Sequence, residues 1–374
     1  MNSNMVICRN EVIIEGENVG QFESFKMQSN SRTFGDSATL VLPLYALGVV
    51  QSGEARNRVR SVFKANVIKP TALVEVFMWY DGMEKIRVFR GFIEHVGEGF
   101  PTVLYLRDFT FMLRFGSMQR GWNGNVTLQQ MVNDCIPVAT EAFKKEREVM
   151  GLSPDVPNLY YEPNDKVVQA TTTPIPAVKF AVGRSPYEIM QYLMQYFMMW
   201  AGVTEDGGVF IGAGVDDKDR IPVTELDTRY NVVGRDIVPI DGRFVDYNVV
   251  VSGLLENGKR YTYTAGLKNS RTTDQRTQFD KKYGEPVRAW CSLQSKEGIE
   301  SFAERVLQHQ KGFRNKGRLT LLLYPKVNIL DSIEYHDSLF PELSGTYYVL
   351  GYNLTANDSG YFQTLEVTDQ IYML

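Results

Sequence analysis

Short runs of alternating apolar and polar residues dominate both ends of the chain and predict β-strands there. Residues 73–80 alternate and then meet Asp81-Gly82, a strong hairpin signal, before residues 86–89 return as the next strand. Further strands are expected at residues 12–14, around residues 22–27 and at residues 38–42. The pattern predicts an N-terminal β-meander that ends near residue 113.

Apolar residues recur at helical spacing in the middle of the chain and predict two helices there. The first begins after Thr127, a suitable N-cap, and Pro137 is expected to end it. The second begins with a capping box at residues 185–188, and Gly202 is expected to follow its C-terminus. Its expected buried stripe is Ile189, Leu193, Tyr196, Phe197 and Trp200.

The C-terminal third returns to strands, with one amphipathic helix among them. Asn257-Gly258 joins two expected strands, and residues 299–307 are apolar at the spacing of one helical face. Strands are expected at residues 319–323, 333–335 and 347–350. Two other stretches are polar: residues 153–176 predict a long surface loop, and residues 54–64 fit either a short basic helix or a solvated loop.

A hairpin-like segment occurs twice. One copy runs from Gly91 to Asp108, and the other runs from Gly351 to Asp369. Each copy has the form of a strand that starts at glycine, a turn, and a strand that closes on aspartate. Two similar β-modules in one chain indicate a building block, and the fold is predicted to be mainly β, with α+β insertions, two barrel-like modules and a helix-containing middle region.

Composition narrows the class of protein. With 374 residues the chain is expected to form about two to four domains, and its 44% hydrophobic and 22% charged content is ordinary for a globular protein. A formal net charge of −4 argues against nucleic-acid binding through the overall field. The cysteines are Cys8, Cys135 and Cys291, without CxxC spacing, which indicates neither a disulfide framework nor a zinc site. No signal peptide or membrane span is expected.

The residue types that usually carry chemistry do not converge on a site. His95, His309 and His336 lack metal-ligand spacing, and the candidate acid and base carboxylates are Glu94, Glu98, Asp108 and Glu205. Residues 216–219 lack the ligand alternation of a calcium loop, and no helix is expected after residues 212–214 to bind phosphate. No catalytic, cofactor-binding or metal-binding residue is therefore assigned, and no cofactor is expected.

One basic cluster occupies residues 311–318. Basic side chains near a helix C-terminus complement the helix dipole, which is the simpler interpretation. The alternative interpretation is contact with nucleic acid or with an acidic partner surface.

The order of these features resembles the baseplate hub proteins of contractile-tailed bacteriophages, which are similar to the N-terminal part of type VI secretion spike proteins. The stretches that carry the resemblance are residues 16–43, 91–113 (G-F-I … Y-L-R-D-F-T-F-M-L), 185–214, 295–303 (S-K-E-G-I-E-S-F-A) and 345–367. Residues 44–68 and 153–176 are longer than this pattern needs.

The resemblance implies a non-enzymatic homotrimer whose six β-modules adapt a sixfold tail tube to a threefold spike. It implies three regions: residues 1–120 as the first tube module, 121–235 as the middle domain, and 236–374 as the second tube module. The implied partners are the tail tube, spike and tape-measure proteins, with DNA passing through the channel without sequence-specific binding. The implied location is the virion tail or baseplate, after synthesis in the bacterial cytoplasm.

Two alternatives from other classes stay open. A tail-associated peptidoglycan hydrolase would use a pair of the carboxylates named above. A carbohydrate-binding tail adhesin would use exposed aromatic platforms, for which Trp122 and Tyr160-Tyr161 are the candidates.

Overall fold

The computed structural model describes residues 7–31, 33–43, 67–98, 101–118, 121–122, 126–163, 174–175, 183–197, 200–212, 222–241, 249–255, 257–266, 287–291, 296–310 and 313–369. The predictions made for residues 54–64 and 216–219 lie outside these ranges.

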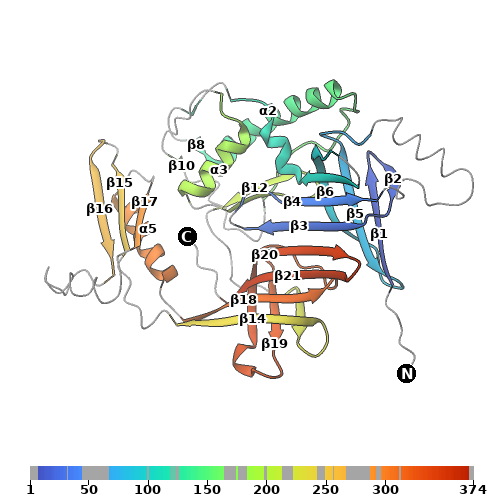
Figure 1. Cartoon of the computed structure of the whole chain (residues 1–374). Helices are drawn as coiled ribbons and strands as arrows, with labels where there is room; N and C mark the ends of the chain where they lie inside the picture. Colours follow the sequence, from blue (N-terminus) through green and yellow to red (C-terminus); the bar gives the residue numbers. More distant parts are fainter. Residues whose placement is uncertain are drawn as a thin grey trace, which may run out of the picture.

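Seven strands at the N-terminal end form what is here called the first sheet half, and the predicted meander is wrong because these strands do not all pair in chain order (Figure 1). They are β1 (Cys8–Ile14), β2 (Glu17–Gly20), β3 (Ser24–Asn30), β4 (Ser37–Leu42), β5 (Leu73–Tyr80), β6 (Ile86–Val96) and β7 (Thr102–Arg107). Hydrogen bonding orders them β3-β4-β7-β6-β5-β1-β2. Side chains of β5 alternate between buried and half-buried positions, because successive residues of a strand point to opposite faces. Gly82 (φ 84°) occupies the β5–β6 turn, as the hairpin signal predicts.

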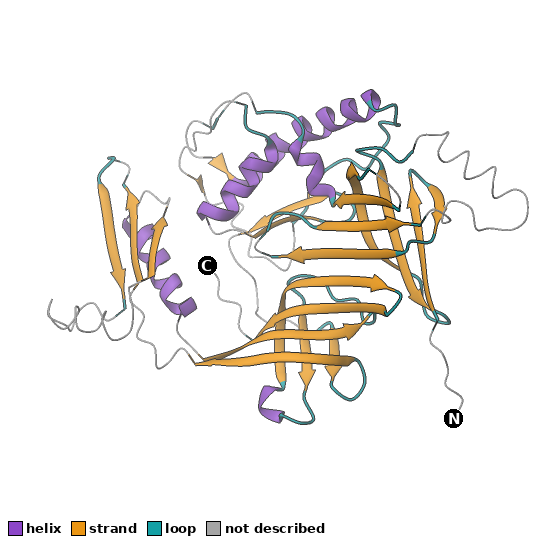
Figure 2. Cartoon of the chain, viewed as in Figure 1, coloured by secondary structure: helices purple, strands orange, loops and turns teal. Residues whose placement is uncertain are grey.

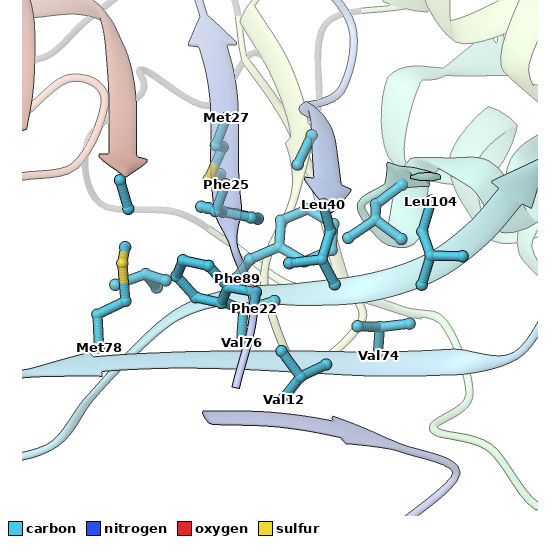
Figure 3. Close-up of a cluster of buried hydrophobic side chains, with 14 of the residues drawn as sticks. Val12, Phe22, Phe25, Met27, Leu40, Val74, Val76, Met78, Phe89 and Leu104 are labelled. Carbon is cyan, nitrogen blue, oxygen red and sulfur yellow. The ribbon is translucent and has the colours of Figure 1, made fainter. Parts of the chain in front are cut away.

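A hydrophobic core covers the inner face of the first sheet half (Figure 3). It includes Val12 of β1, Phe25 and Met27 of β3, Leu40 of β4, Val74, Val76 and Met78 of β5, Phe89 of β6 and Leu104 of β7, none more than 6% exposed. Full burial of one such side chain contributes roughly 1.5–3 kcal/mol. Leu354, Ala356 and Tyr361 from the far end of the chain belong to the same cluster, so the core continues beyond the first sheet half.

The middle region packs helices and short strands over one side of the sheet (Figure 2). Its elements are the 3-10 helix η1 (Phe109–Arg114), β8 (Val126–Thr127), α2 (Leu128–Val149), β9 (Tyr160–Tyr161), β10 (Pro174–Ile175), α3 (Pro186–Phe197), β11 (Trp200–Val203) and β12 (Gly208–Gly212). No helix of the described residues is long and apolar enough to cross a membrane.

The predicted N-cap at Thr127 and the predicted capping box at Ser185 are confirmed, but both predicted helix ends are wrong. Thr127 and Gln130 cap α2, which continues through Pro137 to Val149. The buried side chains of α2 continue past the proline to Phe143, and this packing outweighs the roughly 3 kcal/mol cost of an internal proline. The helix α3 ends at Phe197, so Trp200 belongs to β11 and not to the helical stripe.

Gly202 also lies within β11 instead of capping α3. A Cβ there would lie 2.6 Å from the Phe210 ring on the paired strand β12, so the glycine makes room for that ring. The stretch predicted as a long surface loop contains the two short strands β9 and β10 in its described part.

The second sheet half consists of six strands. They are β13 (Thr224–Asp227), β14 (Val232–Asp241), β18 (Phe313–Leu322), β19 (Ser332–His336), β20 (Gly345–Asn357) and β21 (Gly360–Thr368), with the 3-10 helix η3 (Pro341–Leu343) between β19 and β20. β20 pairs with β3, so both halves join in one 13-stranded sheet. Among the described strands this sheet is open, with β14 and β2 at the ends of its main path, which corrects the expectation of barrel-like modules.

A small α/β unit is inserted between β14 and β18 (Figure 1). It comprises β15 (Val249–Leu254), β16 (Arg260–Ala265), β17 (Val287–Cys291) and α5 (Lys296–Gln310). The Asn257-Gly258 hairpin joins β15 and β16 as predicted, and β17 pairs with β15 in parallel. Ile299, Ala303 and Leu307 of α5 are buried against this sheet, so the predicted amphipathic helix is confirmed.

The two sheet halves share one order of strands. The first half contains the path β3-β4-β7-β6-β5-β1, and the second contains β14-β18-β21-β20-β19-β13. Corresponding strands also follow each other in the same order along the chain, with the α/β unit inserted between β14 and β18. One difference is orientation, because β1 runs antiparallel to β5 whereas β13 runs parallel to β19.

Local irregularities recur at corresponding places. In the first half the register shifts between Ile93 and His95, and in the second it shifts between Val349 and Gly351. A bulge inserts one residue into a strand and increases its twist, so both halves bend their sheet at the same point.

The doubled segment is matched at its aspartate end but not at its glycine end. Phe92 pairs with Arg107, and Tyr348 pairs with Thr368, so Gly91 corresponds to Tyr347 and not to Gly351. The distance along the sequence from Gly91 to Asp108 is nearly equal to that from Gly351 to Asp369 for a different reason. The first hairpin has the longer connection, whereas the second has longer strands joined by a two-residue turn.

Candidate functional site: the junction between the sheet halves

The two sheet halves meet where β3 pairs with β20. The antiparallel register runs from Gly351 opposite Asn30 to Ala356 opposite Phe25. The backbones approach closely, since a Cβ on Gly351 would lie 3.0 Å from the carbonyl oxygen of Ser29. Main-chain hydrogen bonds thus join segments from opposite ends of the chain.

The turn between β11 and β12 inserts two carboxylates into this junction. Glu205 contacts Arg87 of β6 at 3.1 Å and Lys326 of the second sheet half at 3.0 Å. Asp206 contacts Arg90 of β6 at 2.7 Å. Each partly exposed pair contributes no more than about 1 kcal/mol. Together the pairs connect the middle region to both sheet halves.

A cavity of about 410 Å³ lies between these three parts. Residues from each part line it: Ser29 and Asp36 from the first sheet half, Trp200 and Phe210 from the middle region, and Lys326 and Tyr352 from the second sheet half.

Two acidic residues at this cavity, Asp36 and Asp108, are hydrogen-bonded to each other. Asp36 precedes β4, and its amide donates to Asp108 Oδ2 at 2.9 Å, while the Asp108 amide donates to the Asp36 carbonyl at 3.3 Å. Asp108 is the N-cap of η1, and its Oδ1 accepts from the amide (3.1 Å) and the hydroxyl of Thr110. The Ser29 hydroxyl donates to Asp36 Oδ1. The pair therefore fixes the β3–β4 turn against the end of β7.

The second sheet half repeats this exchange of hydrogen bonds. The Asn315 amide donates to Asp369 Oδ2 at 2.7 Å, and the Asp369 amide donates to the Asn315 carbonyl at 3.0 Å. Asp36 and Asn315 are corresponding residues, because Ser37 pairs with Arg107 just as Lys316 pairs with Thr368.

Loss of water contact governs the ionisation of the acid pair, whose two residues are each half-buried. It raises the pKa of Asp36 to about 8, with a further increase from the charge of Asp108 and a decrease from the Ser29 hydrogen bond. Burial also raises the pKa of Asp108 to about 6, against the lowering effect of the Thr110 hydrogen bonds and of Arg107. Burial raises the pKa of Tyr352, across the cavity, well above its usual value.

The carboxylates considered for acid–base chemistry are placed as follows. Glu94 is ion-paired with Arg107 at 2.7 Å and with Arg114 at 2.5 Å. Asp108 and Glu205 both lie at the junction, where both oxygens of Asp108 accept hydrogen bonds. Glu98 is exposed after β6. The structure brings Asp108 together with Asp36, which the sequence analysis did not single out.

Asp36 could not be found from local sequence because its partner lies 72 residues away, across the β4–β7 pairing. The available signal was the polar residue before the strand of residues 37–42, but such residues are common at strand ends.

The histidines do not gather into a metal site. His95 is exposed beside the Tyr105 ring at 5.8 Å, and His336 is exposed at the end of β19. The side chain of His309 lies outside the described residues. Within the described part of the chain, no three His, Cys, Asp or Glu side chains group as metal ligands.

The described part of the basic cluster, Phe313 to Arg318, begins β18 just after helix α5 ends at Gln310. Lys316 and Arg318 are exposed, and Arg318 contacts Glu366 on β21 at 3.6 Å.

The candidate aromatic residues are only partly exposed. The Trp122 indole donates to Asp134 at 2.8 Å and is half-buried. Tyr160 is 44% exposed on β9, and Tyr161 is half-buried.

Comparison with known proteins identifies the fold. No protein-family model matches the chain, and no curated protein matches it in sequence. A tail protein from Neisseria meningitidis MC58 matches with a TM-score of 0.61 and 14% identity, over 98% of each chain. The 43 kDa tail protein of prophage MuSo2 from Shewanella oneidensis matches with a TM-score of 0.59 and 14% identity, over 96% of this chain and 98% of that one.

A longer chain contains a similar arrangement. In a PdpA–VgrG complex of Francisella, one chain matches with a TM-score of 0.50 and 12% identity, over 97% of this chain and 52% of that chain. The resemblance stated from the sequence is confirmed at the level of the fold: the chain has the hub-like fold of phage and prophage tail proteins over nearly its full length.

Proposed function

We propose that the chain is a structural hub of a phage or prophage tail, or of a related injection machine, and that it acts as a homotrimer. The observation that carries the proposal is the shared strand order of the two sheet halves. Three chains with two similar halves each supply six similar units, so a threefold ring can face a sixfold tube while keeping closed symmetry.

In this proposal the partners are the tail tube protein on one side, a trimeric spike on the other, and a tape-measure protein. DNA passes through the ring without sequence-specific contacts, and the location is the virion tail or baseplate. The two tail proteins that share the fold, from Neisseria and from the Shewanella prophage, support this assignment.

Ring closure can repeat a contact that already exists within the chain. β3 of the first sheet half pairs with β20 of the second. In the shared strand order, β14 of the second half corresponds to β3, and β6 of the first half corresponds to β20. Among the described strands, β14 pairs with β18 alone, and β6 beyond Ile93 has β7 as its neighbour on one side only. We infer that β14 of one subunit pairs with the end of β6 of the next subunit.

The register of the β3–β20 pair within one chain predicts the register of the β14–β6 pair between subunits. The pair Asn353–Gln28 corresponds to Gly97–Val238 across subunits. Pro239 follows on β14 and lacks an amide, so this pairing has fewer hydrogen bonds than the internal one. Val238 is 55% exposed, and ring closure would cover it.

Three regions organise the chain in this proposal: a first tube module at residues 1–120, a middle domain and a second tube module. The boundary predicted between residues 235 and 236 falls within β14, which runs from Val232 to Asp241. We place it before β13, because β13 and β14 both belong to the second sheet half.

The geometry favours a non-enzymatic role over peptidoglycan hydrolysis. The hydrogen bonds of the Asp36–Asp108 pair recur at Asn315 and Asp369, where one member is an amide that cannot act as an acid or base. The backbone hydrogen bonds of the pair form with either aspartate or asparagine at the first position, which supports a structural role. Clear lysis on a cell-wall zymogram with the purified chain would contradict this conclusion.

Electron microscopy of the purified full chain tests the proposed hub. We expect closed particles of three chains with six similar lobes, at three times the 42.6 kDa of one chain. Monomers at all concentrations, or rings with another number of chains, would contradict the proposal.

A further inference from the structure

The hydrogen-bonded pair at the junction occurs in two chemical versions. The first sheet half has two acids, Asp36 and Asp108, and the second has one acid and one amide, Asp369 and Asn315. In both versions each backbone amide reaches its partner, so the fold of this corner does not require a charge at the first position. Asn315 shows that a neutral side chain can occupy that position.

The hydrogen bonds around the acid pair leave one carboxylate oxygen, Oδ2 of Asp36, that could carry a proton. Both oxygens of Asp108 accept hydrogen bonds from N–H or O–H groups. Asp36 accepts at Oδ1 from Ser29, and the described contacts place no donor at its Oδ2. A protonated Asp36 would therefore present the same uncharged shape as asparagine.

The charged groups around the cavity do not neutralise Asp36. The titratable or charged side chains that face the pair or line the cavity are Arg107 of β7, Arg90 of β6, Glu205 of the β11–β12 turn, Lys326 and Tyr352. Arg90 and Lys326 are already paired with Asp206 and Glu205. Arg107 acts on Asp108, and Glu205 adds negative charge near Asp36.

We propose that Asp36 binds a proton when the three parts of the junction are assembled, and that loss of this proton loosens the junction. The bound proton lets two acids lie side by side, and its release places a second negative charge between β3, η1 and Tyr352. The junction is thus a proton-sensitive link between both sheet halves and the middle region. This link lies within one chain and does not depend on ring formation.

The direction of the pH effect follows from proton binding. An aspartate in an unfolded chain has a pKa of about 3.9, whereas burial raises that of folded Asp36 to about 8. Between these values the folded chain holds more protons than the unfolded chain, so stability falls as pH rises. The contribution is complete below pH 4 and is lost as pH rises through about 8.

Matched variants test this proposal through the melting temperature of the full chain from pH 5 to pH 9. We expect wild-type melting to fall over this range, with a large part of the fall removed in Asp36→Asn, which should melt above wild type at pH 9. Asn315→Asp creates a second acid pair and should steepen the fall. Asp108→Asn should melt lower at every pH, because asparagine replaces one of the two accepting oxygens with an NH2 group.

Infrared spectroscopy of the folded wild-type chain supplies a readout that needs no variant. We expect the carbonyl band of a protonated carboxylic acid in wild type at pH 7, and its loss in Asp36→Asn. The proposal is overturned if wild type lacks this band at pH 7, or if Asp36→Asn keeps both the band and the full pH dependence.

Discussion

Thr71 and Leu330 occupy corresponding positions and share an unusual backbone conformation. Their φ angles are 69° and 65°, in the left-handed region that favours glycine. The Thr71 amide donates to Ile93 at 2.7 Å, and the Leu330 amide donates to Val349 at 2.8 Å. Each acceptor is the residue before the bulge of its sheet half. Left-handed residues of this kind cost about 1–3 kcal/mol, so recurrence at one place indicates a requirement of the repeated unit.

Relief of that strain should stabilise the protein at Thr71. The side chain is 2% exposed and its hydroxyl has no hydrogen-bond partner. We expect Thr71→Gly to raise the free energy of unfolding by about 1 kcal/mol, since released strain exceeds the entropic cost of glycine. Leu330→Gly is the control and should destabilise, because it also removes a buried leucine. Urea denaturation measures both, and a loss of stability in Thr71→Gly would contradict the strain argument.

Two glycines of the β14–β18 pair should respond differently to alanine. A Cβ on Gly317 would lie 1.9 Å from the Asp236 carbonyl oxygen, whereas a Cβ on Gly234 would have its nearest neighbour at 3.5 Å. We expect Gly317→Ala to cost about 1–3 kcal/mol or more, because the backbones must separate. Gly234→Ala should change stability by less than about 1 kcal/mol. Equal effects in thermal melts would show that this close approach is absent.

The end of α2 is fastened to the first sheet half by a buried ion pair. The Arg147 guanidinium is fully buried, and its nitrogens lie 2.8 Å and 3.1 Å from the two carboxylate oxygens of Glu15. We expect Arg147→Met to cost about 3–5 kcal/mol, since it leaves Glu15 without its partner. Arg147→Met with Glu15→Gln should cost less than the single change. Additive effects within about 0.5 kcal/mol in the double-mutant cycle would argue against coupling.

A charge on the free edge of β14 should weaken ring closure. Lysine on edge strands opposes pairing with another chain. We expect Val238→Lys to weaken trimerisation at least tenfold in sedimentation velocity while leaving the melting temperature of the monomer unchanged. Leu339→Lys is the matched control, because Leu339 is also exposed, at 76%, but lies in the loop after β19. The same loss in both variants would point to a general effect of charge.

Local signals predicted the helices and strands well where a few neighbouring residues specify a turn or a helix cap. Asp81-Gly82, Asn257-Gly258, the N-cap Thr127 and the capping box at Ser185 each specify a local geometry, and each is found in the structure. The resemblance also indicated the fold correctly. These features depend on few residues close in sequence, so one chain contains enough information to predict them.

Non-local features escaped the sequence analysis. Pro137 would end an isolated helix, but buried side chains on both sides of it hold α2 in place. Gly91 and Gly351 look equivalent by spacing, yet different hairpin lengths shift the true register. Asp36 meets Asp108 only through the pairing of β4 with β7. Each of these depends on tertiary packing, which overrides local preference.

A cross-strand disulfide tests the central claim, that the repeated halves close a ring through β14 and β6. The double variant Gly97→Cys with Val238→Cys places two thiols at positions that face each other across subunits, at a Cα separation of about 4.5–5.5 Å that suits a disulfide. Each single variant is the control, with the native thiols of Cys135 and Cys291 buried. After oxidation of the full chain, we expect covalent trimers on a non-reducing gel from the double variant alone. Absence of any cross-link between chains in the double variant would contradict the account.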